Sequence, residues 1–296
     1  MGTRPAGAEQ LHTVVLDWYA RSRRDLPWRR PDRSPWGVLV SEIMLQQTPV
    51  ARVLPVWERW MTLWPSASHL AAASTGEVVR EWGRLGYPRR ALRLHAAATA
   101  IRDEHGGEVP ACEGTLRTLP GIGDYTAAAV AAFAFGHRAT VVDTNVRRVQ
   151  ARLATGTALP APSLTRAEVE LATRLLPEDD EDAATWNVAV MELGALICTA
   201  RAPRCAECPV ADQCAWRLAG SPPYAGPPRR GQAWEGTDRQ CRGRLVQALR
   251  DAEGAVTGAV LRATWPDDGQ RDRCLDALVA EGFIEPLPGD RYGLPA

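Results

Sequence analysis

Four cysteines lie close together near residue 200, where their thiolates could bind a metal. They are Cys198, Cys205, Cys208 and Cys214, with the spacing C-x6-C-x2-C-x5-C. Thiolates this close would repel one another unless a cation or a cluster neutralised them, and both zinc and iron–sulfur clusters accept such ligands. Ligand chemistry alone leaves zinc, an iron–sulfur cluster and chance clustering open, because structural zinc sites more often use two close pairs. The remaining cysteines are isolated in sequence and are interpreted as ordinary thiols: Cys112, Cys241 and Cys274.

Glu42 is a candidate acid because it lies in the apolar segment WGVLVSEIMLQQT. Burial disfavours a charged carboxylate, so the pKa of Glu42 should rise. A carboxyl group that stays protonated near neutral pH can act as a general acid. The commoner alternative is a glutamate on the exposed stripe of an amphipathic helix. The polar run Gln46-Gln47-Thr48, which ends the segment, favours a functional use.

Asp143 is the second candidate carboxylate, in the segment ATVVDTNVRRVQAR. The functional interpretation is a fixed carboxylate that faces developing positive charge. The alternative is that Asp143 only caps the helix that follows it, which is equally compatible with the local sequence.

The segment LPGIGDYTAAAV is a candidate phosphate-binding turn. Gly121 and Gly123 let the backbone approach a ligand, and the helix that follows directs unpaired N–H groups at it. Such a site binds a DNA backbone without reading its sequence. The alternative is a structural turn between two core helices, with Asp124 as an N-cap.

The composition restricts the chemistry. Lysine is absent, so all 35 basic residues are arginines, and no lysine is available to form a Schiff base. The formal net charge is zero, so overall charge does not indicate a nucleic-acid binder. No secretory signal and no apolar stretch of membrane-spanning length are visible, which predicts a cytoplasmic protein.

The elements that must position these residues are predicted to be helices. Apolar residues recur at three- and four-residue intervals, and no alternating strand pattern precedes residue 280. The first 220 residues are therefore predicted to be all-α. The predicted helices span residues 11–20, 36–47, 51–64, 67–73, 76–84, 89–104, 124–135, 144–154, 164–176 and 186–198.

The C-terminal part is predicted to be a separate unit. Residues 221–238 are rich in Pro and Gly and are interpreted as a linker. Residues 239–296 then predict helices at 242–252, 256–264 and 269–281, followed by a hairpin, which is the pattern of a winged helix. The helix at 269–281 lacks the net positive charge that would favour entry into a DNA groove, since acidic residues offset Arg271 and Arg273. A docking or stabilising role is therefore favoured.

Together these segments resemble the helix-hairpin-helix, endonuclease III-like DNA glycosylases, and specifically the adenine DNA glycosylases of the MutY type. The matching pieces are LPWRR, SEIMLQQTPVARVLP, LGYPRRALRLH, LPGIGDYTAAAV, VVDTNVRRV and MELGALIC with its cysteines. The resemblance covers roughly residues 11–220 and implies a mainly α, two-lobed glycosylase fold within residues 1–220. It implies a six-helix barrel lobe at 31–134, and a lobe formed by 8–30 and 135–220 that holds a [4Fe–4S] cluster on the four cysteines.

The resemblance also implies a mechanism of base removal. An adenine flipped out of the duplex would be protonated by Glu42, and Asp143, oriented by Asn145, would stabilise the oxocarbenium-like state. Tyr125 matches the position at which relatives that also cut the strand carry a catalytic lysine. The chain is therefore expected to be a monofunctional hydrolase of N-glycosyl bonds.

Further positions are carried over by the same resemblance. Gln47 and Tyr87 match residues that wedge into the duplex near the mispair, and Trp28 and Arg29 match the edge of the base pocket. The turn residues expected to contact DNA are Leu119, Pro120, Gly121 and Gly123. Val188 and Thr144 depart from the family pattern: Val188 stands where relatives often carry a polar pocket residue, and Thr144 replaces a common glycine.

The predicted partner is double-stranded DNA containing adenine opposite 8-oxoguanine or guanine, bound by a monomer away from any membrane. The short tail does not resemble the larger nudix-like domain that usually ends family members. One alternative is a glycosylase of the same fold for mismatched thymine or uracil. Another is a redox-sensing DNA-binding regulator, with the cluster and a winged helix.

Overall fold

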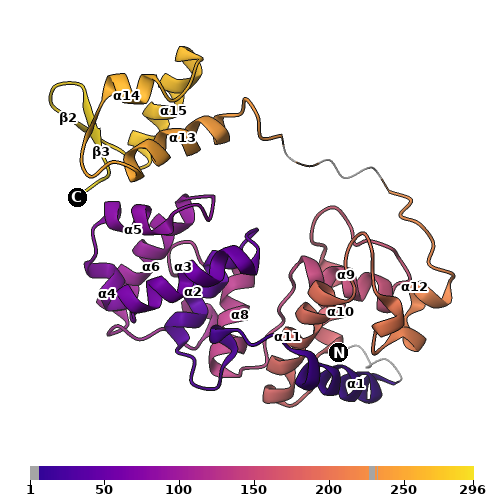
Figure 1. Cartoon of the computed structure of the whole chain (residues 1–296). Helices are drawn as coiled ribbons and strands as arrows, with labels where there is room; N and C mark the ends of the chain where they lie inside the picture. The colour runs from indigo at the N-terminus through magenta and orange to yellow at the C-terminus, as the bar shows by residue number, and fades with distance from the viewer. Residues whose placement is uncertain (1–6, 227–230, 232) are drawn as a thin grey trace. The chain divides into compact units, whose positions relative to one another are not determined.

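A computed structural model describes residues 7–226, 231 and 233–296, which divide into two compact units (Figure 1). The first unit comprises Met1–Glu42, Pro110–Thr118 and Ile122–Pro227, and the second comprises Ile43–Val109, Leu119–Gly121 and Pro228–Ala296. The predicted linker, 221–238, lies partly outside the described residues. The predicted lobe boundaries follow a different division and stay a prediction.

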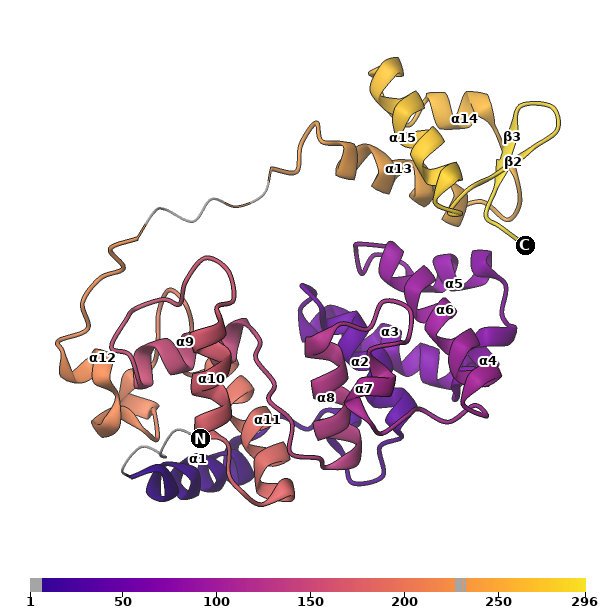
Figure 2. The same cartoon turned by 180° about the vertical axis from the view of Figure 1, so that it is seen from behind.

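The first unit is helical, as predicted. Its elements are α1 (Ala8–Ser22), the 3-10 turn η1 (Pro27–Arg29), α2 (Pro35–Leu45) up to Glu42, α7 (Glu113–Leu116), α8 (Asp124–Phe135), α9 (Thr144–Leu153), α10 (Arg166–Leu175), α11 (Asp180–Leu196), the 3-10 turns η2 (Cys205–Glu207) and η3 (Ala211–Gln213), and α12 (Ala215–Leu218). In Figure 2, α7 and α8 lie side by side, in agreement with their contacts. The predicted LPGIG turn lies between these two helices in the sequence.

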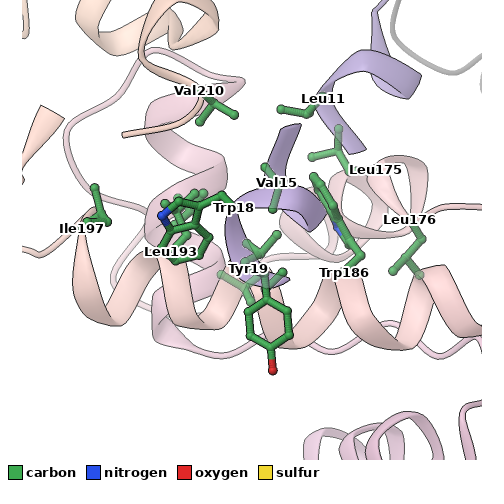
Figure 3. Packing of buried hydrophobic residues seen from close by; sticks show 14 of the residues in the cluster. Leu11, Val15, Trp18, Tyr19, Leu175, Leu176, Trp186, Leu193, Ile197 and Val210 are labelled. Carbon is green, nitrogen blue, oxygen red and sulfur yellow. The ribbon is translucent and has the colours of Figure 1, made fainter. Parts of the chain in front are cut away.

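The core of the first unit forms where α1 packs on α9 and α11. Its buried residues include Val15, Trp18, Trp186 and Leu193, and Figure 3 shows these side chains gathered between the helices. The His12 ring meets Trp186 edge-on, with ring centroids 4.9 Å apart. This cluster fixes α9 and α11 against each other, and these helices carry several candidate site residues.

The second unit combines four helices with the C-terminal segment. Its elements are α3 (Val50–Leu63), α4 (Ala67–Ala72), α5 (Thr75–Trp82), α6 (Arg89–Glu104), α13 (Asp238–Arg250), β1 (Val256–Thr257), α14 (Gly258–Arg262), α15 (Asp268–Ala280), β2 (Glu285–Leu287) and β3 (Arg291–Gly293). Trp60 packs edge-to-face on Trp64 and Trp82, with centroid distances of 4.8 and 5.5 Å. A capping box of Ser74 and Glu77 begins α5.

The C-terminal segment contains three helices and a three-stranded antiparallel sheet in the order β1-β3-β2. The expectation of no strand before residue 280 is wrong, because Val256 pairs with Tyr292. A two-residue strand carries no alternation, so only its distant partner defines it. This content is compatible with a winged helix, and that classification stays a prediction.

The C-terminal segment also shares a buried cluster with α5. Val79 of α5 lies in the same hydrophobic cluster as Leu245 and Phe283. Cys241 and Cys274 are free, buried thiols of this cluster, which confirms their interpretation as ordinary thiols. Among residues 7–226 and 233–296, none of the helices combines the length and apolar character that a membrane crossing requires.

Candidate functional site

Glu42 is buried in α2 and is hydrogen-bonded to one side chain of α8. Its exposed fraction is 5%, and the Tyr125 hydroxyl donates to Glu42 Oε2 at 2.9 Å. Burial raises the pKa of Glu42 to about 7, against the Tyr125 hydrogen bond and the positive charge of Arg29, which lower it; the negative charge of Asp143 raises it further. The predicted burial and raised pKa are therefore confirmed. The carboxyl group is poised to be protonated near neutral pH.

Tyr125 is itself held in the neutral form. Burial raises the pKa of its hydroxyl well above the ordinary value, and the negative charges of Glu42 and Asp143 add to the rise. A phenol in this state donates a hydrogen bond and does not act as an anion. The charges of Glu42 and Asp143 both act on the Tyr125 hydroxyl, so the three side chains form one electrostatic group.

Asp143 is both a helix cap and a fixed carboxylate, so the two sequence interpretations are compatible. Its Oδ1 accepts from the Val146 amide at 2.7 Å, at the start of α9. Its Oδ2 accepts from Asn145 Nδ2 at 2.7 Å. Burial raises the pKa of Asp143, while these hydrogen bonds and the charge of Arg148 lower it. Both oxygens are thereby held in a defined orientation.

A chain of hydrogen bonds runs from Asp143 to the cysteine loop. Arg148 Nη2 donates to Asn145 Oδ1 at 2.7 Å and to the Gly194 carbonyl at 2.6 Å. Arg148 Nε donates to the Cys198 carbonyl at 2.6 Å. Gly194 is required for this approach, because a Cβ there would lie 2.6 Å from Asn145 Cβ. Arg148 therefore joins α9 to α11 and to the cysteine loop through contacts inside the protein.

Glu192 was missed by sequence reasoning, although it stands in the quoted segment MELGALIC. Its side chain is fully buried in α11 and accepts from Arg24 Nε at 2.8 Å, and Arg29 Nη1 lies 3.0 Å from its Oε2. Burial would raise the pKa of Glu192, but the hydrogen bonds from Arg24 and the charge of Arg29 together lower it. A charged residue in an otherwise apolar helix was the available signal. Glu192 thus holds Arg29, whose positive charge lowers the pKa of Glu42.

The predicted base-pocket residues are placed differently from one another. Trp28 is buried in η1, with 4% exposed. Arg29 helps to line a pocket of about 220 Å³ whose other lining residues are Arg23, Arg24, Asp25, Leu26, Arg30 and Pro31. Val188 is partly buried and packs against the α1–α11 cluster. The side-chain amide of its neighbour Asn187 donates to the Ala139 carbonyl at 2.8 Å and so ties α11 to the segment before Asp143.

Gln47 and Tyr87, the predicted wedge residues, share an unusual backbone conformation. Their φ angles are 55° and 45°, in the left-handed region that side chains other than glycine rarely adopt. Tyr87 is also exposed, with 42% of its surface accessible. Strain of this kind costs about 1–3 kcal/mol per residue and tends to occur at functional sites. The strained backbone of Gln47 and Tyr87 agrees with the role that the resemblance implies for them, insertion into the duplex near the mispair, and that role stays a prediction.

Arg90 holds these two strained loops together and was not predicted. Its Nη1 donates to the carbonyls of Ile43, Met44 and Gln46 at 2.8, 2.9 and 2.6 Å. Its Nη2 donates to Thr48 Oγ1 and to the Gly86 carbonyl, both at 3.0 Å. Burial lowers the pKa of Arg90 to about 10. The pair of arginines in LGYPRRA gave no sign of which one would be buried.

The LPGIG turn leads into α8, and the N-cap of that helix is Gly123 and not Asp124, as the alternative had it. Gly121 has a φ of 78°, and a Cβ there would lie 2.6 Å from Arg93 Cβ, so this position requires glycine. Gly123 is the N-cap of α8 in an extended conformation, with open space around it. Asp124 is therefore the first helical residue, and its exposed carboxylate lies 3.4 Å from Arg117 Nε. Leu119 is buried while Pro120 is exposed.

The four clustered cysteines form a suitable donor set for a metal cluster. All four are free, partly buried thiols. Burial raises the pKa of the Cys208 thiol to about 11, and the charges of Cys198, Cys214 and Cys205 raise it further, so the four sulfurs lie within electrostatic range. Arg152 Nη1 donates to Cys198 Sγ at 3.3 Å. The chemistry of this donor set, four thiols on one loop, fits a thiolate-ligated iron–sulfur cluster.

Comparison with known proteins agrees with this geometry. Residues 40–174 match the HhH-GPD superfamily base excision DNA repair protein, and residues 198–214 match the iron-sulfur binding domain of endonuclease III. The second match decides for an iron–sulfur cluster. The chain is 55% identical over 285 residues to the adenine DNA glycosylase of Mycobacterium tuberculosis, covering 96% of this chain and 93% of that protein.

More distant relatives match less of the chain. The adenine DNA glycosylase of Homo sapiens is 43% identical over 209 residues, which cover 68% of this chain and 38% of that protein. Among solved structures, a thermostable thymine-DNA glycosylase superposes with a TM-score of 0.64 at 29% identity, covering 72% of this chain and 97% of that chain.

Proposed function

The chain belongs to the adenine DNA glycosylases, base excision repair enzymes of the HhH-GPD superfamily, and we propose that it removes adenine mispaired with 8-oxoguanine or guanine. The observation that carries the proposal is the buried Glu42 carboxyl, whose pKa is raised to about 7. It is coupled to Tyr125 and to the fixed Asp143. Two carboxyl groups in different environments, here Glu42 and Asp143, can divide the tasks of general acid and electrostatic stabiliser.

The reaction begins with proton transfer from Glu42. The proton passes to the ring of an adenine extruded from the duplex, and the base becomes a better leaving group. The N-glycosidic bond then breaks, and its electron pair leaves with adenine. Positive charge develops on the deoxyribose, where the Asp143 carboxylate stabilises it or traps it transiently. Water completes the hydrolysis and leaves an abasic site.

The chain's remaining site residues position these groups. Asn145 and the Val146 amide orient Asp143, and Glu192 holds Arg29 near Glu42. Tyr125 occupies the position of the lysine of strand-cutting relatives, and no lysine is present, so base removal leaves the strand intact. Four thiolates, those of Cys198, Cys205, Cys208 and Cys214, hold a [4Fe–4S] cluster. When bound, that cluster supplies covalent cross-links to the loop that Arg148 and Arg152 contact.

DNA binding is assigned to three groups of residues. The turn Leu119–Gly123 and the N-terminus of α8 contact the phosphate backbone, because helix N-termini favour anions. Gln47 and Tyr87 enter the duplex near the mispair, and Trp28, Arg29 and Val188 line the edge of the base pocket. The enzyme acts on this duplex as a monomer.

A panel of mispaired duplexes tests the proposal. Full-length holoprotein is incubated in excess over duplexes containing A:8-oxoguanine, A:G, T:G or U:G, and the products are separated with and without alkali. We expect strand breaks only after alkali, and only with the two adenine mispairs. The Glu42→Gln variant is the matched control. Processing of T:G with both adenine duplexes intact would contradict the proposal and favour a thymine or uracil glycosylase.

A further inference from the structure

An arginine-rich segment begins near the end of α1 and leads towards α2. The chain has a formal net charge of zero, yet residues 21–33 contain six arginines and two aspartates. Four of these arginines line the pocket of about 220 Å³ described above, and we call them the arginine pocket: Arg23, Arg24, Arg29 and Arg30. Positive charge is thus concentrated in one short segment, where it can attract an anion although the whole chain is neutral.

The arginine pocket keeps an excess of positive charge after its ion pairs are counted. Glu192 binds two of the arginines, because Arg24 Nη2 lies 2.5 Å and Arg29 Nη1 lies 3.0 Å from its Oε2. Arg30 pairs with Asp25 at 2.9 Å, and both of these side chains are more than half exposed, so water screens the pair. Four guanidinium groups therefore face two carboxylates, which leaves two positive charges.

Arg23 is the member of the pocket that no carboxylate compensates. It is the C-cap of α1, and its guanidinium carbon lies 6.0 Å from the Tyr19 ring centroid. Tyr19 belongs to the buried core of the first unit, so this contact restricts where Arg23 can point. The Arg23 side chain is exposed and forms no ion pair within the described part of the chain. A guanidinium group has five N–H donors, and contact with one tyrosine leaves most of them available to a ligand.

The chemistry of the pocket fits a phosphate group. Guanidinium groups stay charged at physiological pH and donate pairs of parallel N–H groups to phosphate oxygens. A phosphodiester carries one negative charge, which the two uncompensated positive charges of the pocket can neutralise. The ligand class that the pocket would bind is therefore the backbone of a nucleic acid.

Arg29 connects the pocket to the proposed acid. It lines the pocket, and its positive charge lowers the pKa of both Glu42 and Tyr125. The pocket therefore lies within electrostatic range of Glu42. The part of a DNA duplex nearest to an adenine held at Glu42 is the backbone of the same nucleotide, which carries one phosphate on each side.

We propose that the arginine pocket binds a phosphodiester group directly beside the extruded adenine nucleotide, on the strand that carries it. The inference rests on the proposed function, in which adenine leaves the duplex and reaches Glu42. Extrusion costs the unstacking and unpairing of the base. A phosphate held in the pocket offsets part of this cost, because it binds the backbone in its extruded position without reading the sequence.

Methylphosphonate duplexes test the proposal, because this group replaces one phosphodiester by a neutral analogue. Each A:8-oxoguanine duplex carries one such group, either at one of the two phosphates that flank adenine or at the matching positions of the opposite strand. Binding is measured with the Glu42→Gln holoprotein, which prevents turnover, alone and combined with Arg23→Ala or Arg21→Ala. Arg21 is the matched control, since it is an exposed arginine in the last turn of α1 that does not line the pocket.

We expect Arg23→Ala to weaken binding to the unmodified duplex about tenfold near 0.1 M salt, and to reduce the slope of log K against log salt by about one, as for one lost phosphate contact. One methylphosphonate beside adenine should cause a similar loss, and the two changes together should cost little more than either alone. Arg21→Ala should show no such coupling.

Three results would overturn the proposal. They are additive losses from Arg23→Ala and from both methylphosphonates beside adenine, coupling only to the opposite strand, and equal coupling in Arg21→Ala. Both arginines are exposed, so neither substitution leaves a buried cavity, and the visible absorption of the cluster checks that each variant is folded. Single-turnover adenine release is measured separately with Glu42 restored. Its absence from the unaltered enzyme would instead refute the proposed function.

Discussion

Replacing Glu42 by glutamine should stabilise the protein at alkaline pH while it abolishes catalysis. Burial raises the pKa of Glu42 from 4.5 to about 7, so the folded state disfavours the ionised form. A stability contribution of this sign is complete below the unfolded pKa and is lost as the pH rises through the folded pKa. At about 1.4 kcal/mol for each tenfold change in the protonation equilibrium, ionisation of Glu42 costs about 3 kcal/mol above pH 7.

Glutamine removes this cost because its amide carries no charge. Its carbonyl oxygen can still accept the hydrogen bond that the Tyr125 hydroxyl donates to Glu42. The variant should therefore melt close to the parent protein at pH 5 and roughly 6 °C above it at pH 8.5, at about 2 °C for each kcal/mol in a protein of this size. Calorimetry of both holoproteins at the two pH values measures the difference.

Glu104→Gln is the matched control, since Glu104 is exposed near the end of α6. It makes the same chemical change without removing a buried charge, so its melting difference should not depend on pH. If Glu42→Gln also showed no pH-dependent gain, the carboxyl group would be well solvated, and the argument for a raised pKa would be refuted.

Three further changes probe the supporting residues. Asn145→Ala removes the 2.7 Å hydrogen bond to Asp143, and single-turnover adenine release should fall about 10- to 100-fold with near-normal duplex binding; an unchanged rate would contradict the positioning role. Arg90→Lys keeps the charge but loses the planar group that bridges two loops, so melting should fall and binding to mispaired duplex should weaken; retention of both would show that the strained loops hold themselves. Cys208→Ser should remove the visible absorption of the cluster, whereas serine at the exposed Cys112 should keep it.

The helical framework was predictable because local sequence determines it. Periodic apolar residues, the Gly and Pro breaks and the apolar surroundings of Glu42 are all short-range signals, and the burial of Glu42 follows from them. The Gly121 turn was predictable for the same reason, since its φ of 78° is a local requirement.

The rest of the site depends on contacts between residues far apart in the chain. Glu192 meets Arg24 across 168 positions, and Arg239 meets Tyr87 across 152. No local pattern shows which charged side chain becomes buried, because its partner is supplied by another helix. Arg90 is the clearest case, since its acceptors are backbone carbonyls that any sequence would provide.

The pH dependence of single-turnover adenine release tests the central claim, that protonated Glu42 starts the reaction. With the enzyme in excess over an A:8-oxoguanine duplex, the rate should be limited by bond cleavage. Since the pKa of Glu42 is about 7, the rate should fall about tenfold for each pH unit above that value, and Glu42→Gln should lack this limb. A rate that stays constant from pH 7 to about pH 9 in the unaltered enzyme would contradict the account.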